Sequence, residues 1–325
     1  MSVKTPARSK VGCAGVVVED IFCGPMQEMP PEGLLVSVDA MPTKAGGCAA
    51  NVAIDLVKQG LVVEVAGCVG EDAAGTGLRA CFAEHGIDAA NLCTSTTLPT
   101  SRTVILLVEG EDRRYVHLFG ANRGFTAAGI DRDWLASLGV FYLGGLFALP
   151  AIRLEELTDV FAHCRAHGVV TVLDVVIPSA GEVPSLAELR PLLELSDYFL
   201  PNEDEAARLT GTRDVDEQMA AFLRHGADTV IITRGEQGAV AGRADQRWSS
   251  GSYPEQGVDP SGAGDAFTSG VIASILAGRE MPDLLRYAAA IGVSATRAVG
   301  TTDGVVGAAE AAAYVAAHPL AVEHL

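Results

Sequence analysis

Short apolar runs alternate with helix-like stretches along most of this chain, and no other feature of the sequence restricts its fold as strongly. Residues 62–66, 140–143 and 229–233 are apolar runs of strand length, which is typical of strands buried on both faces. Residues 49–60 instead carry apolar side chains at helical spacing and end on Gly60, which suits a left-handed helix end. This order predicts a mostly parallel sheet with right-handed crossovers and helices on both faces.

The same alternation continues through the second half of the chain. The sequence predicts a buried strand that runs into a polar loop within residues 12–22, and further strands over residues 169–176 and 198–200. It also predicts helices over residues 151–167 and 203–209, and a helix that ends near Gly226. Of the 325 residues, 49% are hydrophobic and only 6% are aromatic, and small aliphatic side chains suit helices packed on a sheet. We therefore expect a soluble α/β protein.

One stretch departs from this rhythm. Residues 103–119 contain two strand-like runs on either side of a charged, glycine-containing turn, and they leave no room for a helix between them. We predict a β-hairpin here and place it, with the irregular residues 23–44, outside the main sheet. The expected organisation is a single domain over residues 1–325, with a small β lid built from excursions at about 21–45 and 96–122.

Charge and cysteine usage exclude several classes of protein. The formal net charge is −18 and the basic residues form no cluster, so a nucleic-acid partner is not expected. The seven cysteines are scattered and include no C-x-x-C pair, which is typical of a reducing cytoplasm. The apolar run at residues 11–18 ends at Glu19 and Asp20 instead of small residues, which argues against a signal peptide. Since no apolar run reaches membrane-spanning length, no membrane association is expected either.

The strongest chemical signal is the start of a helical pattern in the stretch DPSGAGDAF. Gly262, Ala263 and Gly264 precede the pattern, and Asp265 falls in its first turn. Glycines at a helix start let the backbone approach an anion, and the unpaired N–H groups and the positive helix end favour phosphate. Asp265 would then face an attacking hydroxyl. A plain strand-to-helix turn, with Asp265 offsetting the helix dipole, is the alternative that this short motif leaves open.

As a whole, this stretch resembles the signature of the ribokinase-like, or PfkB, carbohydrate kinase family, which usually has Thr where this chain has Pro260 or Ser261. The stretch GGCAAN at residues 46–51 resembles the family's earlier G-G-x-x-x-N motif. The resemblance implies a three-layer αβα sandwich with a central mostly parallel sheet and a small β lid. It also implies that Asp265 is the catalytic base beside an anion cradle formed by residues 262–264.

The family resemblance also implies a set of substrate-binding residues. In the family, the paired glycines and the Asn of the earlier motif contact substrate hydroxyls, which assigns that role to Gly46, Gly47 and Asn51. Asp20, at the end of the first predicted strand, matches an Asp that grips sugar hydroxyls, and an ionised carboxylate accepts strong hydrogen bonds. A plain helix start and a solvated loop carboxylate remain the alternatives, with Glu19 as a second candidate for the role of Asp20.

Two later motifs indicate the nucleotide and metal sites. The stretch NEDE at residues 202–205 resembles the family's N-x-x-E motif, which implies that Asn202 contacts the nucleotide and that Glu205 serves Mg²⁺, in part through water. An acidic helix start is the other interpretation. The stretch TRGEQG resembles the T-x-G-x-x-G turn that holds ATP, which makes Thr233, Gly235 and Gly238 the expected nucleotide-binding residues.

Two finer expectations come from some relatives only. Residues matching Asp259 and Ser261 bind a monovalent cation there, which implies K⁺ as a further cofactor. Lid hairpins in relatives often pair between subunits, which implies a homodimer through the apolar side chains of the hairpin, namely Ile105, Leu107, Val116 and Leu118.

The function expected from these signals is transfer of the γ-phosphoryl of ATP to a hydroxyl of a sugar or sugar acid. A nucleoside kinase of the same family and a non-catalytic sugar or nucleotide sensor are the alternatives. Ribose itself is not favoured, because Cys48 stands where ribokinase has Lys and residues 144–146 lack the sugar-contacting carboxylate. A dinucleotide oxidoreductase is disfavoured, since the glycine-rich residues 67–77 lack the G-x-G-x-x-G spacing.

Overall fold

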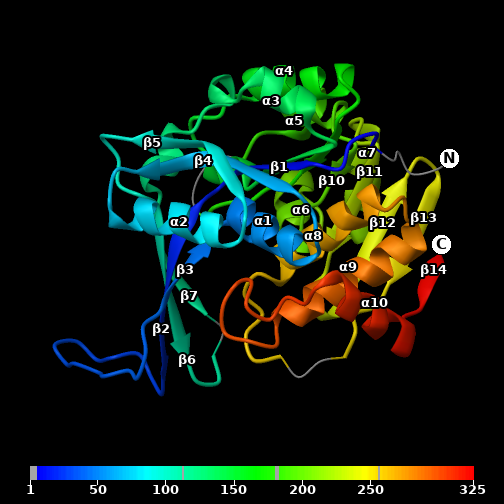
Figure 1. Cartoon of the computed structure of the whole chain (residues 1–325). Coiled ribbons are helices and arrows are strands. Elements are labelled where there is room, and N and C mark those ends of the chain that lie inside the picture. The colour runs from blue at the N-terminus through cyan, green and yellow to red at the C-terminus, as the bar shows by residue number, and fades with distance from the viewer. Residues whose placement is uncertain (1–5, 112, 180–182, 255–256) are drawn as a thin grey trace.

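A ten-stranded sheet forms the centre of the molecule in a computed structural model that describes residues 6–111, 113–179, 183–254 and 257–325 (Figure 1). Seven neighbouring strands are parallel, and three antiparallel strands extend the sheet beyond β11. From one edge to the other, the strands are β5 (Asp88–Ser95), β4 (Val63–Gly70), β1 (Val11–Gly15), β8 (Val140–Gly144), β9 (Val170–Leu173), β10 (Tyr198–Phe199), β11 (Thr229–Thr233), β12 (Ala239–Arg243), β13 (Gln246–Ser250) and β14 (Val322–His324).

Helices cover both faces of this sheet, because its central strands are apolar on both sides. One core cluster packs the first face under α1 (Cys48–Lys58), α2 (Ala73–Glu84), α8 (Ala263–Leu276), α9 (Met281–Ala295) and α10 (Ala308–Ala317). A second cluster packs the other face under α3 (Arg132–Ser137), α4 (Leu154–Ala166), α5 (Leu186–Leu193), α6 (Glu203–Thr210) and α7 (Val215–Arg224). Figure 1 shows the resulting three layers, which confirm the predicted αβα sandwich.

A second, four-stranded sheet lies to one side of the sandwich (Figure 1). Its strands, in spatial order, are β3 (Thr43–Gly46), β2 (Val18–Met26), β6 (Arg102–Val108) and β7 (Arg114–Leu118). Strands β6 and β7 form the antiparallel hairpin that the charged turn predicts. The remaining pairs are β2 with β3, antiparallel, and β2 with β6, parallel.

The first predicted strand is wrong in one respect that bears on the site. Residues 12–22 are not a strand followed by a polar loop. Instead, β1 ends at Gly15, whose φ of 137° only glycine adopts easily, and a second strand, β2, begins at Val18 in the second sheet. Asp20 therefore lies within β2 and not at the carboxyl end of β1. The apolar run from Val11 to Val18 hides this break from a sequence pattern.

Four 3₁₀ turns complete the regular structure: η1 (Gly120–Gly124), η2 (Ala127–Gly129), η3 (Leu146–Ala148) and η4 (Gly235–Gln237). Within the described parts of the chain, none of the helices combines the length and the apolar character needed to cross a membrane.

Candidate active site

The carboxyl ends of the parallel strands face the starts of α1 and α8, and the predicted site residues gather there. Asp174 directly follows β9, Asn202 follows β10 and Thr233 ends β11. In open α/β sheets this edge is where ligands bind, because strand ends and helix starts meet there.

The start of α8 is built around glycine. Gly262 caps the helix with φ 77°, and a Cβ atom at this position would lie 1.9 Å from the carbonyl oxygen of Thr301. Gly264 is different, because a Cβ atom there would meet no atom within 4 Å. The first turn of α8 therefore opens onto free space, where its N–H groups are available to an anion.

Asp265 lies in this first turn and contacts α1. Its Oδ2 accepts a hydrogen bond of 2.8 Å from Nδ2 of Asn51. Burial raises the pKa of Asp265, and hydrogen bonds from Asn51 and Cys48 partly offset the rise. The other end of the Asn51 amide, Oδ1, is buried and has no hydrogen-bond partner among the residues that the structure describes. An external hydroxyl near Asp265 would supply that missing donor.

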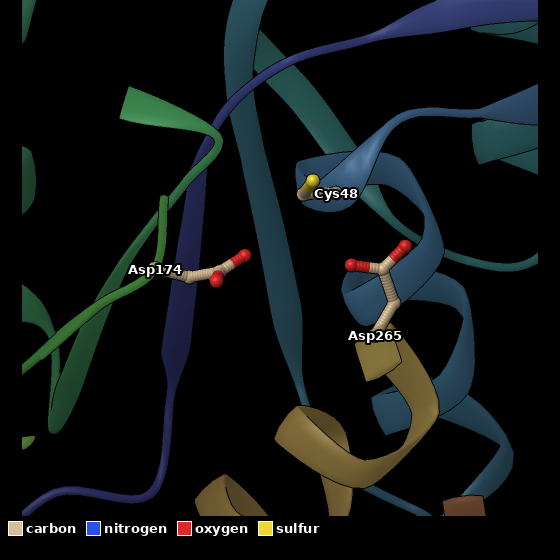
Figure 2. Close-up of side chains that lie close together, drawn as sticks. All are labelled: Cys48, Asp174 and Asp265. Carbon is tan, nitrogen blue, oxygen red and sulfur yellow. The ribbon is translucent and has the colours of Figure 1, made fainter. Parts of the chain in front are cut away.

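A second carboxylate faces Asp265 across the site. Figure 2 shows Asp174 and Asp265 pointing toward one another, with the Cys48 thiol beside them, and the ligand atoms of the three residues all lie within 4.8 Å of one another. The Tyr142 hydroxyl donates to Asp174 Oδ2 at 3.0 Å. Burial, reinforced by the charges of Glu205 and Asp265, holds the pKa of Asp174 well above its ordinary value.

Asp174 and Tyr142 are site residues that sequence reasoning missed. The signal for Asp174 was an acidic residue immediately after the buried strand β9. In a parallel sheet, that position shares its edge with the ends of β8, β10 and β11. No comparable signal marks Tyr142, which lies inside β8 and is fully buried.

Asp20 reaches the site from the second sheet. It is only 6% exposed and lies against Gly46, where a Cβ atom would come within 1.8 Å of Asp20 Oδ2. Burial raises the pKa of Asp20 to about 7, although a hydrogen bond with Thr103 acts in the opposite direction. Glu19 pairs instead with Arg102 at 2.8 Å. The structure therefore places Asp20, and not Glu19, beside the paired glycines.

Asn202 and Glu205 form a reciprocal cap at the start of α6. The Asn202 side chain accepts from the Glu205 N–H at 2.9 Å, and Glu205 Oε2 accepts from the Asn202 N–H at 2.9 Å. This cap is the structural role that the sequence left open as an alternative. Burial raises the pKa of Glu205 to about 7, and the charge of Asp265 adds to the rise. Glu205 thus caps a helix, and its charge also raises the pKa of Asp174.

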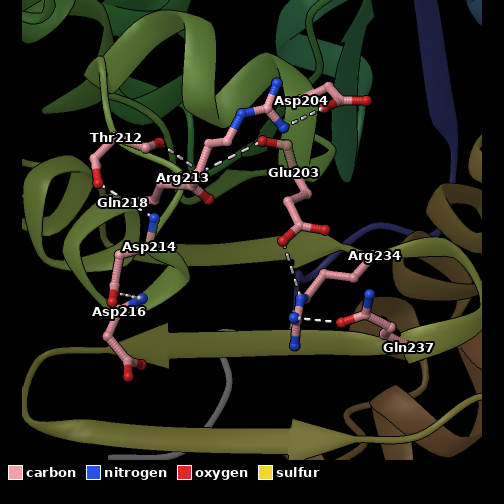
Figure 3. Close-up of polar contacts among 9 residues, drawn as sticks. All are labelled: Glu203, Asp204, Thr212, Arg213, Asp214, Asp216, Gln218, Arg234 and Gln237. Carbon is pink, nitrogen blue, oxygen red and sulfur yellow. Dashed lines mark hydrogen bonds and ion pairs between the residues drawn. The ribbon is translucent and has the colours of Figure 1, made fainter.

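Side chains around the start of α6 hold Arg234 in place (Figure 3). Its Nε lies 3.6 Å from a Glu203 carboxylate oxygen, and its Nη2 donates to Gln237 at 2.5 Å. Figure 3 also shows that Asp204 turns the other way, toward Arg213 at 3.7 Å. Arg234 is therefore engaged by its own chain, while Thr233 beside it lines a cleft.

A cleft of about 360 Å³ lies between the start of α8 and the turn after β11. It brings together three of the expected nucleotide-binding residues, Thr233, Gly235 and Gly238, with Gly264 of the anion cradle. Residues from α9, including Gly292 and Thr296, form another part of its wall. A hollow of about 560 Å³ elsewhere lies near the amino ends of β10 and β11 and contains none of the predicted site residues.

Asp259 and Ser261 lie immediately before the cradle and are buried. Asp259 accepts hydrogen bonds from the backbone N–H of Ser261 at 2.9 Å and of Gly300 at 3.1 Å. Arg113, from the β6–β7 hairpin, also contacts both side chains.

Comparisons with known proteins agree with this geometry. The model of the family described as "pfkB family carbohydrate kinase" matches residues 13–306. Fructoselysine 6-kinase of Shigella flexneri is 29% identical over 241 residues, which cover 74% of this chain and 85% of that protein. The 2-dehydro-3-deoxygluconokinase of Bacillus subtilis is 27% identical over 281 residues, which cover 84% of this chain and 87% of that protein.

A solved structure shows the same fold. It is assigned as a ribokinase II of E. coli in complex with ATP and Mg²⁺, and it superposes with a TM-score of 0.81. Its sequence is 24% identical, and the match covers 95% of this chain and all of that one. This chain therefore belongs to the pfkB family of carbohydrate kinases, and it is an enzyme of that class.

Proposed function

We propose that this kinase transfers the γ-phosphoryl of ATP to a hydroxyl group of a sugar or sugar acid. The observation that carries the proposal is the position of Asp265. Its carboxylate lies at the open start of α8, next to the cleft that contains Gly264, and is held by Asn51 at 2.8 Å. A base, an anion cradle and a hydroxyl-binding amide are the three groups that this transfer needs in one place.

The transfer follows from these positions. Asn51 Oδ1 and the Asp20 carboxylate would accept hydrogen bonds from the acceptor and so orient the attacking hydroxyl. As the new P–O bond forms and the bond to the β-phosphate breaks, the hydroxyl proton passes to Asp265 and ADP leaves. Because the proton becomes acidic only late in a loose transition state, a carboxylate is a strong enough base. The N–H groups at the start of α8 would stabilise the charge on the transferring group.

Mg²⁺ is part of the proposal because the acidic cluster fits it. Asp174, Glu205 and Asp265 are partly buried carboxylates whose pKa values are raised. The charge of Asp265 adds to the rise at the other two, and that of Glu205 adds to the rise at Asp174. Oxygen ligands of this kind suit Mg²⁺, which usually keeps several waters. Asp174 and Glu205 would hold the ion, in part through water. When bound, it would neutralise charge on the carboxylates and on the phosphates of ATP.

We also propose that the chain is a single domain in which the second sheet is the lid. Asp20 from β2 enters the site directly, so this sheet forms one wall of the acceptor site. Excluding water there would limit hydrolysis of ATP.

A homodimer through this lid would use a different set of side chains from the one expected. The register pairs Ile105 with Tyr115 and Val104 with Val116, so Ile105 and Val116 point to opposite faces of the sheet. Ile105 is 2% exposed, whereas Val116 is 62% exposed. A second copy would therefore cover Val116 and Leu118, and sedimentation of the purified protein would test this pairing.

We also propose that this chain works in a reducing cytoplasm, which fits its seven free cysteines. A nucleoside in place of a sugar remains the runner-up acceptor, and a sensor without catalysis remains the alternative outside enzymes. The family resemblance implies a K⁺ site at Asp259 and Ser261, and Arg113 contacts both of these side chains.

An ADP-release assay with Mg·ATP tests the function against pentoses, hexoses, sugar acids, sugar phosphates and nucleosides. Asp265→Asn is measured in parallel, with Asp204→Asn as a control because Asp204 is an exposed first-turn carboxylate. Turnover of a sugar or sugar acid that only Asp265→Asn abolishes would support the proposal. Turnover of nucleosides alone would favour the runner-up, and ATP binding without turnover would favour the sensor.

A further inference from the structure

The turn of the β6–β7 hairpin reaches the loop that leads into the anion cradle. Arg113, just before β7, places Nη1 3.2 Å from Asp259 Oδ1 and 3.0 Å from Ser261 Oγ. The pair is well enclosed, since the Arg113 side chain is 20% exposed and that of Asp259 is 4% exposed. The guanidinium also lies over the Tyr115 ring, 5.9 Å from its centroid, which restricts its orientation.

Asp259 is central to the shape of the cradle. Its two carboxylate oxygens accept from the N–H groups of Ser261 and Gly300, and its own N–H donates to the Thr296 carbonyl at 3.2 Å. These bonds tie the residues before Gly262 to the loop after α9. Buried carboxylates in proteins are usually paired with a positive group, and Arg113 is that partner here.

A freely exchanging monovalent cation does not fit this arrangement. A cation bound by the Asp259 carboxylate and Ser261 would compete with a guanidinium nitrogen that is already within hydrogen-bonding distance of both side chains. Arginine keeps its charge at all ordinary pH values, so the position carries a permanent positive charge from the chain itself.

The geometry points to Arg113 as a built-in replacement for the monovalent cation: its guanidinium neutralises Asp259 and holds the anion cradle in shape. Arg113 is thus a positioning residue, which acts on ATP through Asp259 and Ser261. It also links the second sheet to the nucleotide half of the site. This inference rests on the proposed kinase function, because it concerns the cradle for the ATP phosphates.

The test compares K⁺ with tetramethylammonium at constant ionic strength. Wild-type turnover and the Kd for Mg·ATP, measured by calorimetry, should agree within about twofold between the two salts. Arg113→Ala should lose about tenfold or more in both quantities in tetramethylammonium, and K⁺ or added guanidinium should restore much of that loss. Arg114→Ala is the matched control, because Arg114 is a neighbouring exposed arginine that pairs with Glu111.

Three results would overturn the inference. These are a wild-type enzyme that K⁺ activates tenfold or more, an Arg113→Ala variant equal to wild type in both salts, and a loss in that variant that neither cation restores. Because the calorimetric Kd does not need an acceptor, the inference is tested even if no compound of the panel is phosphorylated. Thermal melts of both variants confirm that they are folded before binding is compared.

Discussion

Helices α1 and α8 both begin beside the site at a glycine with positive φ, 87° at Gly47 and 77° at Gly262, yet their starts differ in what lies in front of them. The start of α1 is already occupied, since a Cβ atom at Gly46 would lie 1.8 Å from the Asp20 carboxylate. The start of α8 is open at Gly264. A helix start that faces a carboxylate suits hydroxyl donors, whereas an open one suits phosphate. The proposed acceptor and nucleotide sites thus lie at two different helix starts.

The largest expected effect concerns the carboxylate that lies between the two helix starts. Asp265→Asn should lower kcat by about 10² to 10⁴, the usual range for loss of a general base, with little change in the Kd for ATP. Kinetics of ADP release and calorimetry measure the two quantities. A variant with kcat near that of the wild type would show that Asp265 is not the base.

The two helix starts should respond differently to an added methyl group. In Gly47→Ala, the alanine would have to keep the positive φ of Gly47, and its Cβ would lie 2.6 Å from the Val16 carbonyl oxygen. The free energy of unfolding should therefore fall by about 2 kcal/mol or more. Gly264→Ala has room for its methyl group, so thermal stability should hold while ATP binds about tenfold more weakly. Equal losses of stability in both variants, seen in thermal melts, would contradict the contrast.

The raised pKa of Asp20 predicts a pH dependence in the binding of the acceptor. Its pKa is raised to about 7, mainly by burial, so the carboxylate gains a proton as pH falls through that value and stops accepting hydrogen bonds. The KM for the acceptor should therefore rise about tenfold between pH 8 and pH 6. It is measured at saturating Mg·ATP, because the pKa of Glu205 is also raised to about 7. Asp20→Asn should remove this pH dependence, and an unchanged profile in that variant would rule Asp20 out as its source.

The smallest effect concerns Asp55, which is fully buried on α1 and whose carboxylate oxygens lack hydrogen-bond partners within the described residues. Burial raises the pKa of Asp55 well above its ordinary value. A raised pKa in the folded state means that stability present below about pH 4 is lost as pH rises through the folded pKa. Asp55→Asn should thus stabilise the protein by about 1 kcal/mol at pH 8 and by nearly nothing at pH 4. Thermal melts across this range would refute the idea if the gain were largest in acid.

The spacing of apolar residues predicted the strands and helices that keep one regular pattern of burial along their length. The strand Thr229–Thr233 agrees residue for residue, and the helix that ends at Gly60 is α1. The break between β1 and β2 was missed, because Val16 and Val17 continue the apolar run while the chain changes sheets. The antiparallel strands β12 and β13 follow β11 with no α-helix between them, so they fall outside the alternating pattern.

The site was predictable where it carries a family motif and unpredictable where it depends on tertiary contact. The motif residues Gly264 and Thr233 line one cleft, as expected. Asp174 has no motif around it, and only the sheet order brings it opposite Asp265. Arg113 reaches Asp259 across 146 residues of sequence, a contact that no local pattern encodes.

The parallel pairing of β2 with β6 has a consequence for synthesis of the chain. It joins Glu19 to Arg102, roughly eighty residues apart, so at about 5–20 residues per second β2 leaves the ribosome some 4 to 16 seconds before its partner. During that interval only the short strand β3 is available to cover one edge of β2. The second sheet is therefore completed late, after the segments of α1 and α2 have already been synthesised.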